Sequence, residues 1–210
     1  MSESSAARLS GLIAILRGIR PDESVAVGQA LYGAGLRIIE VPLNSPQPFD
    51  SIALLRQALP ADCLVGGGTV MSPADVQRLR DAGAGLVVMP HGDAAVIRAA
   101  VAAGLQCAPG VATPTEAFAA LAAGAHGLKL FPAEQLPPAV LKAWRAVLPR
   151  EVPLLPVGGI TPQTLAAYLD AGAQGFGLGS ALYKPGMPVA EVAVAAQAFQ
   201  AAWLAWHGHR

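Results

Sequence analysis

The sequence predicts an α/β fold, a compact (β/α)₈ TIM barrel built as a single domain over residues 1–210. Short apolar runs recur eight times along the chain, and their starts lie 20 to 26 residues apart. Ala- and Leu-rich stretches with one polar face lie between these runs and are typical of amphipathic helices. Eight strand-then-helix units favour a closed barrel near the lower size limit of the fold. An open doubly wound sheet is the alternative, but no GxGxxG motif opens the first helix.

The eight apolar runs are expected to be the strands. Each is long enough for a strand and too short for a helix. Because the runs are continuously apolar, they indicate a parallel sheet that is covered on both sides. They span residues 12–16, 38–43, 64–70, 85–89, 105–111, 127–131, 152–160 and 175–182.

Hydroxyl-proline pairs mark the expected helix starts, and glycines mark the ends. A hydroxyl at the N-cap with proline at the first helical position is predicted at Ser45-Pro46, Ser72-Pro73, Thr113-Pro114 and Thr161-Pro162. Thr113 and Glu116 also form a capping box. Left-handed C-caps are predicted at Gly33 to Gly35, Gly83, Gly104, Gly124 and Gly172. Helices are expected at 73–82, 138–148, 162–170 and 189–206, and residues 1–10 as a loose tail or an extra helix.

Composition excludes several classes of function. The 14 basic and 14 acidic residues give no net charge, which argues against nucleic-acid binding and against an electrostatic membrane tether. No apolar run approaches the roughly 20 residues of a membrane span, and the N-terminus has no signal-peptide pattern, so we expect a cytoplasmic protein. Cys63 and Cys107 are interpreted as buried structural thiols, and the four scattered histidines predict no metal site.

Lys129 is the first candidate for catalysis. It lies in Gly-Leu-Lys-Leu-Phe-Pro (127–132), with apolar neighbours on both sides in the sixth strand, whereas Lys142 and Lys184 fall on a helix and in a loop. Whether it points into the barrel or into the helical layer, burial disfavours the ammonium and lowers the pKa. A neutral buried amine is the group that Schiff-base catalysis needs. The alternative is a structural lysine paired with a carboxylate.

Glu40 is the second candidate, because no other acidic residue is embedded in a strand run. A buried carboxylate beside a buried amine is either an ion pair or a general acid/base whose pKa has moved toward neutrality. The residue alone does not decide between these two roles.

Other polar groups and glycines follow the strands at the end where barrels carry their chemistry. Arg17 closes the first strand and offers a cation for a carboxylate or phosphate. Thr69 follows Gly66-Gly67-Gly68, a glycine run that allows close approach to the backbone. Gly158-Gly159 and Gly179-Ser180 end the seventh and eighth strands, where backbone amides commonly hold phosphate.

Nearly the whole chain, about residues 10–205, resembles the class I 2-keto-3-deoxy-6-phospho-sugar-acid aldolases. The resemblance is carried by Leu-Ile-Ala-Ile-Leu-Arg-Gly-Ile (12–19), Ile-Glu-Val-Pro-Leu-Asn-Ser-Pro (39–46), Gly-Gly-Gly-Thr-Val (66–70), Cys-Ala-Pro-Gly-Val-Ala-Thr-Pro-Thr-Glu (107–116), Leu-Lys-Leu-Phe-Pro-Ala (128–133), Val-Gly-Gly-Ile (157–160) and Gly-Leu-Gly-Ser (177–180).

The resemblance implies roles for these residues. Lys129 matches the Schiff-base lysine and Glu40 the general acid/base. The substrate-binding set that the resemblance implies is Arg17, Asn44, Thr69, Pro90, Phe131, Val157, Gly158, Gly159, Gly179 and Ser180. It further implies a phosphorylated sugar-acid substrate, pyruvate and glyceraldehyde 3-phosphate as products, no metal or other cofactor, and a homotrimer.

Asn44, Arg17 and Val157 resemble the branch of this family that acts on the phosphogalactonate epimer, and the phosphogluconate epimer is the alternative substrate. Met89-Pro90-His91 and Ala133-Glu134 depart from the family pattern at the rim of the barrel. Two other interpretations remain. One is a thiamin-phosphate-synthase-like barrel, which leaves Lys129 and Glu40 without a role, and the other is a catalytically silent phospho-sugar sensor.

Overall fold

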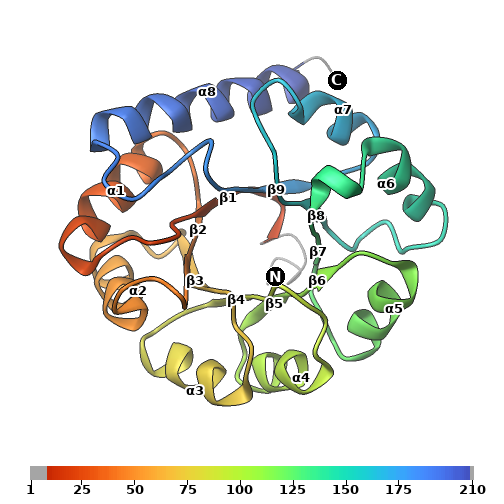
Figure 1. Cartoon of the computed structure of the whole chain (residues 1–210), viewed down its shortest axis with the longest axis horizontal. Coiled ribbons are helices and arrows are strands. Elements are labelled where there is room, and N and C mark those ends of the chain that lie inside the picture. The colour runs from red at the N-terminus through yellow and green to blue at the C-terminus, as the bar shows by residue number, and fades with distance from the viewer. Residues whose placement is uncertain (1–8, 209–210) are drawn as a thin grey trace.

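Parallel strands form a ring at the centre of the molecule, and eight α-helices surround it in the computed structural model, which describes residues 9–208 (Figure 1). The strands are β1 (Gly11–Ile15), β2 (Ile38–Pro42), β3 (Leu64–Gly68), β4 (Leu86–Val88), β5 (Gln106–Ala108), β6 (Gly110–Val111), β7 (Leu128–Leu130), β8 (Leu154–Pro156) and β9 (Gly175–Leu178). The helices are α1 (Pro21–Gly33), α2 (Pro48–Ala58), α3 (Pro73–Asp81), α4 (Ala94–Ala102), α5 (Pro114–Ala122), α6 (Pro138–Arg145), α7 (Leu165–Asp170) and α8 (Val189–Gly208), with a 3₁₀ helix, η2 (Ala133–Gln135), after β7.

The predicted barrel is confirmed, although nine strands rather than eight are defined. The fifth apolar run divides at Pro109, which has no N–H to donate, into β5 and β6. Two hydrogen-bonded sheets result, ordered β5-β4-β3-β2-β1-β9 and β6-β7-β8. At the other junction a bridge pairs Val157 with Gly177, and Gln174 N donates to Leu154 O at 3.1 Å, so the ring closes.

Side chains of the strands alternate between two apolar cores. The larger core lies between strands and helices and contains, for example, Ile39 and Val41 of β2 and Leu128 and Leu130 of β7. A smaller cluster inside the ring consists of Leu9, Ile13, Ile38, Leu64, Leu86, Val88, Ala108 and Leu155. Because successive side chains of a strand point to opposite faces, a residue that lies between two outward residues must point into the barrel.

Two of the four predicted helix caps are confirmed. The Ser72 hydroxyl accepts a hydrogen bond from Asp75 N, and Thr113 with Glu116 forms the capping box. The predicted C-cap glycines Gly35, Gly83, Gly104, Gly124 and Gly172 have positive φ values, whereas Gly33 is the last residue of α1 and does not.

The other two predicted caps are wrong. Helix α2 begins two residues later than expected, at Pro48, because the Ser45 hydroxyl accepts instead from Gly18 N of the loop after β1, at 2.9 Å. Helix α7 begins at Leu165, because Thr161 and the Thr164 hydroxyl form a turn of their own. Helix α6 also ends earlier than expected, at Arg145. The predicted tail or extra helix at 1–10 lies, for residues 1–8, outside the described residues.

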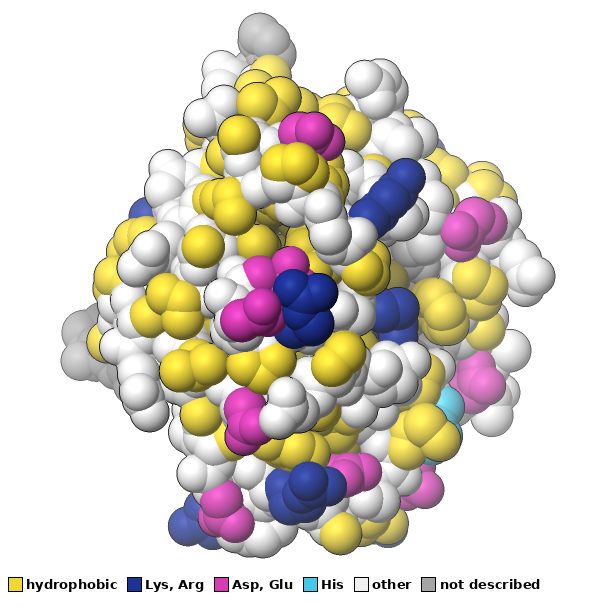
Figure 2. Space-filling model, turned by 60° about the vertical axis from the view of Figure 1, so that its left-hand side comes forward, with side chains coloured by type: hydrophobic (Ala, Val, Ile, Leu, Met, Phe, Trp, Pro, Cys, Tyr) yellow, Lys and Arg dark blue, Asp and Glu magenta, His cyan; other side chains and the backbone are white. Residues whose placement is uncertain are grey.

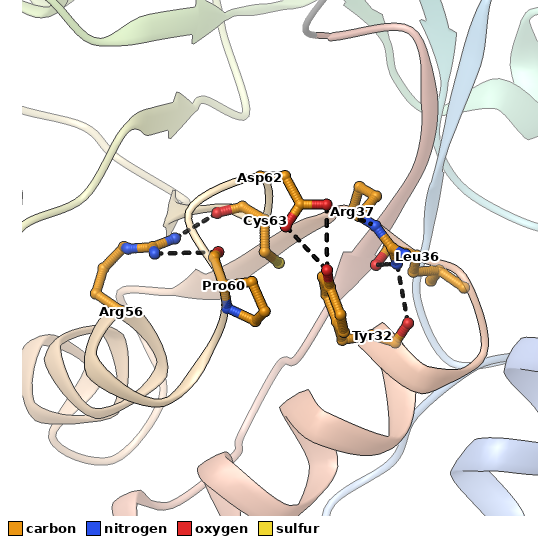
Figure 3. Close-up of polar contacts among 7 residues, drawn as sticks. All are labelled: Tyr32, Leu36, Arg37, Arg56, Pro60, Asp62 and Cys63. Atoms are coloured by element: carbon orange, nitrogen blue, oxygen red, sulfur yellow. Dashed lines mark hydrogen bonds and ion pairs between the residues drawn. The ribbon is translucent and has the colours of Figure 1, made fainter.

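The N-terminal end of the barrel, where the strands begin, is fastened by arginines (Figure 3). Arg37 lies over the Tyr32 ring at 3.9 Å and pairs with Asp62 at 3.2 Å, and the Tyr32 hydroxyl donates to the same carboxylate at 2.9 Å. Arg56 donates to the carbonyl oxygens of Cys63, Leu59 and Pro60. These contacts join the loops that lead into β2 and β3.

The outer surface mixes charges of both signs. On the face shown in Figure 2, acidic and basic side chains lie beside one another among apolar ones. Among residues 9–208, no helix is both long and apolar enough to cross a membrane.

Candidate active site

Glu40 and Lys129 both point into the barrel, near the end where the strands stop. Each lies between two residues of the outer core, so the alternation of the strand turns its own side chain inward. Strands β2 and β7 are opposite one another in the ring, separated by three strands in either direction when β5 and β6 are taken as one. The sequence left the direction of Lys129 open, and the structure gives the interior of the barrel.

Both groups are buried enough to shift their protonation. Glu40 is 1% exposed, and burial raises its pKa to about 7 against the opposing positive charges of Lys129 and Arg17. Lys129 is 7% exposed, and burial lowers the pKa of its amine, with Arg17 adding to the decrease and Glu40 opposing it. Among the described residues no ion pair within 4 Å joins them. Glu40 can therefore gain or lose a proton near neutral pH, as acid/base chemistry requires, and the neutral form of the Lys129 amine is favoured by its burial.

The glycine run of β3 makes room for the Glu40 carboxylate. A Cβ on Gly68 would lie 1.7 Å from Glu40 Oε2, so any larger residue there would collide with the carboxylate. Oε2 is buried and has no hydrogen-bond partner among the described residues. The close approach that the glycines predicted is thus made by the protein's own carboxylate, and an unpaired buried carboxylate oxygen indicates a functional role.

Arg17 is held at the mouth by two neighbours. Its guanidinium donates to Asn44 Oδ1 at 2.6 Å and to Thr69 Oγ1 at 3.5 Å. Thr69 has a φ of 55°, a left-handed backbone that costs a β-branched residue about 1–3 kcal/mol. The predicted residues Arg17, Asn44 and Thr69 are therefore brought together, with strain of the kind that clusters at functional sites.

A cavity of about 320 Å³ opens from Lys129 toward the ends of β8 and β9. Lys129 Nζ lies 4.5 Å from the centroid of the Phe131 ring, which is 38% exposed. Predicted residues that line the cavity are Arg17, Lys129, Phe131, Val157, Gly158, Gly159, Gly179 and Ser180. Residues that line it without having been predicted include Ile15, Glu134, Ile160 and Thr161. The predicted residues Glu40, Asn44, Thr69 and Pro90 are not among those that line this cavity, although Pro90 follows β4 at the same end of the barrel.

The far end of the cavity offers unused backbone donors. Among the described residues, no hydrogen bond uses the amide of Gly159, Ile160, Gly179 or Ser180. Gly158 and Gly159 have φ values of 112° and 61°, which favour glycine. Backbone amides without a partner can bind anions. The cavity therefore has a buried amine at one end and unpaired backbone amides at the other.

The described residues contain no cluster of three or more His, Cys, Asp or Glu that could hold a metal ion. Both cysteines are buried and free, as expected, and burial raises the pKa of Cys63 to about 11 and that of Cys107 to about 12. Neither thiol is positioned to serve as a nucleophile.

A buried lysine opposite a buried carboxylate, in the mouth of a (β/α)₈ barrel, is the arrangement of a class I aldolase. A family model described as KDPG and KHG aldolase matches residues 4–197. The chain belongs to this family, and the resemblance seen in the sequence is confirmed.

Similar proteins fall into two groups. A probable 2-dehydro-3-deoxy-6-phosphogalactonate aldolase of Rhizobium meliloti is 50% identical over 94% of this chain and 93% of its own. The 2-dehydro-3-deoxy-6-phosphogalactonate aldolase of Escherichia coli is 47% identical over 91% and 94%. A solved structure described as native KDPGal has a TM-score of 0.92 and 46% identity, covering 94% of this chain and 96% of that one. Relatives named for phosphogluconate are 29% to 34% identical over about 70% of this chain.

Proposed function

We propose that this chain is a class I aldolase that reversibly cleaves 2-dehydro-3-deoxy-6-phospho-D-galactonate to pyruvate and D-glyceraldehyde 3-phosphate. The observation that carries the proposal is that Lys129 and Glu40 both point into the barrel, and that Lys129 lines a cavity whose far end presents backbone amides without a hydrogen-bond partner among the described residues. The higher identity to relatives named for the phosphogalactonate substrate favours that epimer over phosphogluconate.

Lys129 is the proposed nucleophile. Its neutral amine attacks the C2 ketone of the substrate, and loss of water gives an iminium whose positive nitrogen accepts the electron pair of the C3–C4 bond. Burial, which lowers the pKa of Lys129, keeps a fraction of the amine neutral. The Phe131 ring beside Nζ limits access of water to the intermediate.

Glu40 is the proposed general base and acid. It removes the proton of the C4 hydroxyl through a water, so that the C3–C4 bond breaks and leaves glyceraldehyde 3-phosphate and an enamine. Glu40 then returns a proton to C3, and hydrolysis of the imine releases pyruvate and restores Lys129. A pKa of about 7 suits both directions of this transfer.

The remaining residues bind the two ends of the substrate. Arg17, held by Asn44 and Thr69, supplies the permanent cation of the mouth for a carboxylate or phosphate. The amides at Gly158-Gly159 and Gly179-Ser180 hold the phosphate, while Val157 borders the middle of the substrate. No metal is needed, because the iminium does the polarising. A homotrimer in the cytoplasm completes the proposal, and sedimentation analysis tests the oligomer.

Pyruvate release from the two purified epimers tests the function. We expect a higher kcat/KM for the phosphogalactonate epimer. A higher value for phosphogluconate would reassign the substrate, whereas no turnover of either would favour a phospho-sugar sensor.

A further inference from the structure

Glu134, which belongs to η2, is held against the anion-binding end of the cavity by its neighbours in the chain. Ala133 N donates to Val157 O at 2.8 Å, which places η2 beside the residue that precedes Gly158. On the other side, the buried Tyr168 hydroxyl donates to Ala133 O at 2.9 Å and to Leu136 O at 3.3 Å. These hydrogen bonds fix the backbone on both sides of Glu134 and therefore the position from which its side chain extends.

The carboxylate of Glu134 lies directly over the glycine pair. A Cβ on Gly158 would lie 2.2 Å from Glu134 Oε2, and one on Gly159 would lie 3.0 Å from Glu134 Cγ. The side chain thus occupies the space that the two glycines leave open. Glu134 also lines the same cavity as Lys129 and Arg17, and it is the acidic side chain among the residues that line it.

A negative charge at this place opposes the binding of an anion by the backbone amides. The unused amides of Gly159, Ile160, Gly179 and Ser180 favour an anion, yet an anion that binds them meets the Glu134 carboxylate. Like charges that are close together repel one another, and the effect is modest here because Glu134 is exposed. A phosphate therefore has to displace the side chain as well as desolvate the amides.

We propose that Glu134 is a specificity-determining residue that acts as an internal competitor for the phosphate site. Its carboxylate covers the Gly158-Gly159 pair, a phosphate displaces it on binding, and its return assists release of the phosphorylated aldehyde. The inference rests on the proposed function, because it requires phosphate at this glycine pair. It adds that the site is tuned for weak binding of phosphate rather than for the tightest binding that the amides allow.

The test is Glu134→Gln, which keeps the shape of the side chain and removes the charge. The inhibition constant of inorganic phosphate should fall by roughly twofold to fivefold, the effect of removing one exposed like charge. In condensation with pyruvate, the ratio of KM for glyceraldehyde 3-phosphate to KM for unphosphorylated glyceraldehyde should fall by a similar factor. Glu151→Gln is the matched control, since Glu151 is exposed in the loop leading into β8 at the opposite end, and should leave both values unchanged.

Two results would overturn the inference. An inhibition constant that stays constant or rises in Glu134→Gln would show that the carboxylate does not compete with phosphate. Equal changes for both aldehydes would show that the carboxylate acts on the site as a whole.

A third variant, Gly158→Ala, distinguishes failure of the inference about Glu134 from failure of the proposed phosphate site. Phosphate that inhibits wild type, loses its effect in Gly158→Ala and is unaffected by Glu134→Gln would remove only the role of Glu134. Phosphate that inhibits none of the three enzymes would remove the phosphate site at Gly158-Gly159 and this inference with it, while pyruvate release would still test the aldolase function.

Discussion

The two ends of the barrel differ in how their charged side chains are paired. At the N-terminal end, Arg37 and Arg56 donate to carbonyl oxygens, and Arg37 also pairs with the Asp62 carboxylate (Figure 3). Arg145, at the same end, donates to carbonyl oxygens and to an amide oxygen. At the C-terminal mouth, Glu40 keeps an unpaired oxygen, and Lys129 is paired with no carboxylate within 4 Å among the described residues.

The difference shows which end is built for stability and which for chemistry. Satisfied polar contacts lower the free energy of the folded state, whereas a buried carboxylate without a partner raises it. Such a group persists because the surrounding barrel is stable enough to carry it. Substitutions at the mouth should thus reduce activity and spare or increase stability, and substitutions at the other end should do the reverse.

The largest expected effect is that of Lys129→Ala. Turnover should fall by about four orders of magnitude or more, because no other amine of the described cavity can form the imine. Steady-state cleavage measures this, with Lys142→Ala as the control because Lys142 is exposed on α6. Retention of a tenth of the wild-type rate would contradict the role of Lys129.

Glu40→Gln should affect proton transfer next most strongly. The variant should still form the imine with pyruvate, but exchange of the methyl protons with solvent should slow by about 10²–10⁴. Proton NMR in deuterated buffer follows the exchange. If it proceeds at the wild-type rate, Glu40 is structural.

Arg145→Ala examines the opposite end. Arg145 donates to Gly172 O and Val152 O, each at 2.9 Å, and to Gln174 Oε1. Its loss leaves these acceptors unpaired and should lower the free energy of unfolding by about 2–4 kcal/mol, with kcat unchanged. Urea unfolding and steady-state rates measure the two quantities, and the exposed Arg150→Ala is the control. A lower kcat for Arg145→Ala, with the free energy of unfolding unchanged, would contradict the assignment of this end of the barrel to stability.

The free energy of unfolding of the protein should depend on pH through Glu40. Its pKa of about 7 in the folded state lies above the ordinary 4.5, so the folded protein holds a proton that the unfolded chain releases in this window. The contribution of Glu40 to the free energy of unfolding is therefore greatest below pH 4.5 and is lost as pH rises to 7. Relative to wild type, Glu40→Gln should gain up to about 3 kcal/mol across this range. A difference that is equal at pH 5 and pH 8 would contradict it, and Glu151→Gln should show no trend.

The smallest expected effect concerns the choice of epimer. Val157 borders the cavity and packs against Gly177, where a Cβ would lie 2.6 Å from Val157 Cγ2. The apolar Val157 side chain can discriminate between the epimers only by shape, which is worth about 1–3 kcal/mol. Val157→Thr keeps this shape and adds a hydroxyl that can hydrogen-bond the C4 hydroxyl of the phosphogluconate epimer. The ratio of kcat/KM for phosphogluconate to that for phosphogalactonate should therefore rise. An unchanged ratio would show that the C4 configuration is read elsewhere.

Sequence patterns predicted the barrel and its two central side chains because both depend on local information. A charged residue inside a continuously apolar strand is visible at Glu40 and Lys129 without any knowledge of neighbours. The helix starts at Pro48 and Leu165 were missed, since Ser45 is bonded by Gly18 of another loop and Thr161 by Thr164. Capping rules do not include such competing partners.

Glu134 shows the same limit within the site. In the sequence it is only a departure from the family pattern after Phe131-Pro132. Its place over Gly158 depends on the hydrogen bond between Ala133 and Val157, which are far apart in the chain. The signal that could have found it is an acidic residue directly following the lysine strand, opposite a Gly-Gly pair. The extent of the domain, the compartment and the homotrimer stay predictions.

Borohydride reduction of the protein with pyruvate, followed by peptide mapping, identifies the lysine that forms the imine. The chain has three lysines, and only Lys129 is buried in the cavity, while Lys142 and Lys184 are exposed. We expect a pyruvate-derived mass increase on the peptide that contains Lys129 and on neither of the peptides that contain Lys142 and Lys184. Modification of Lys184 or Lys142 instead, or no modification under conditions in which the enzyme turns over, would contradict it.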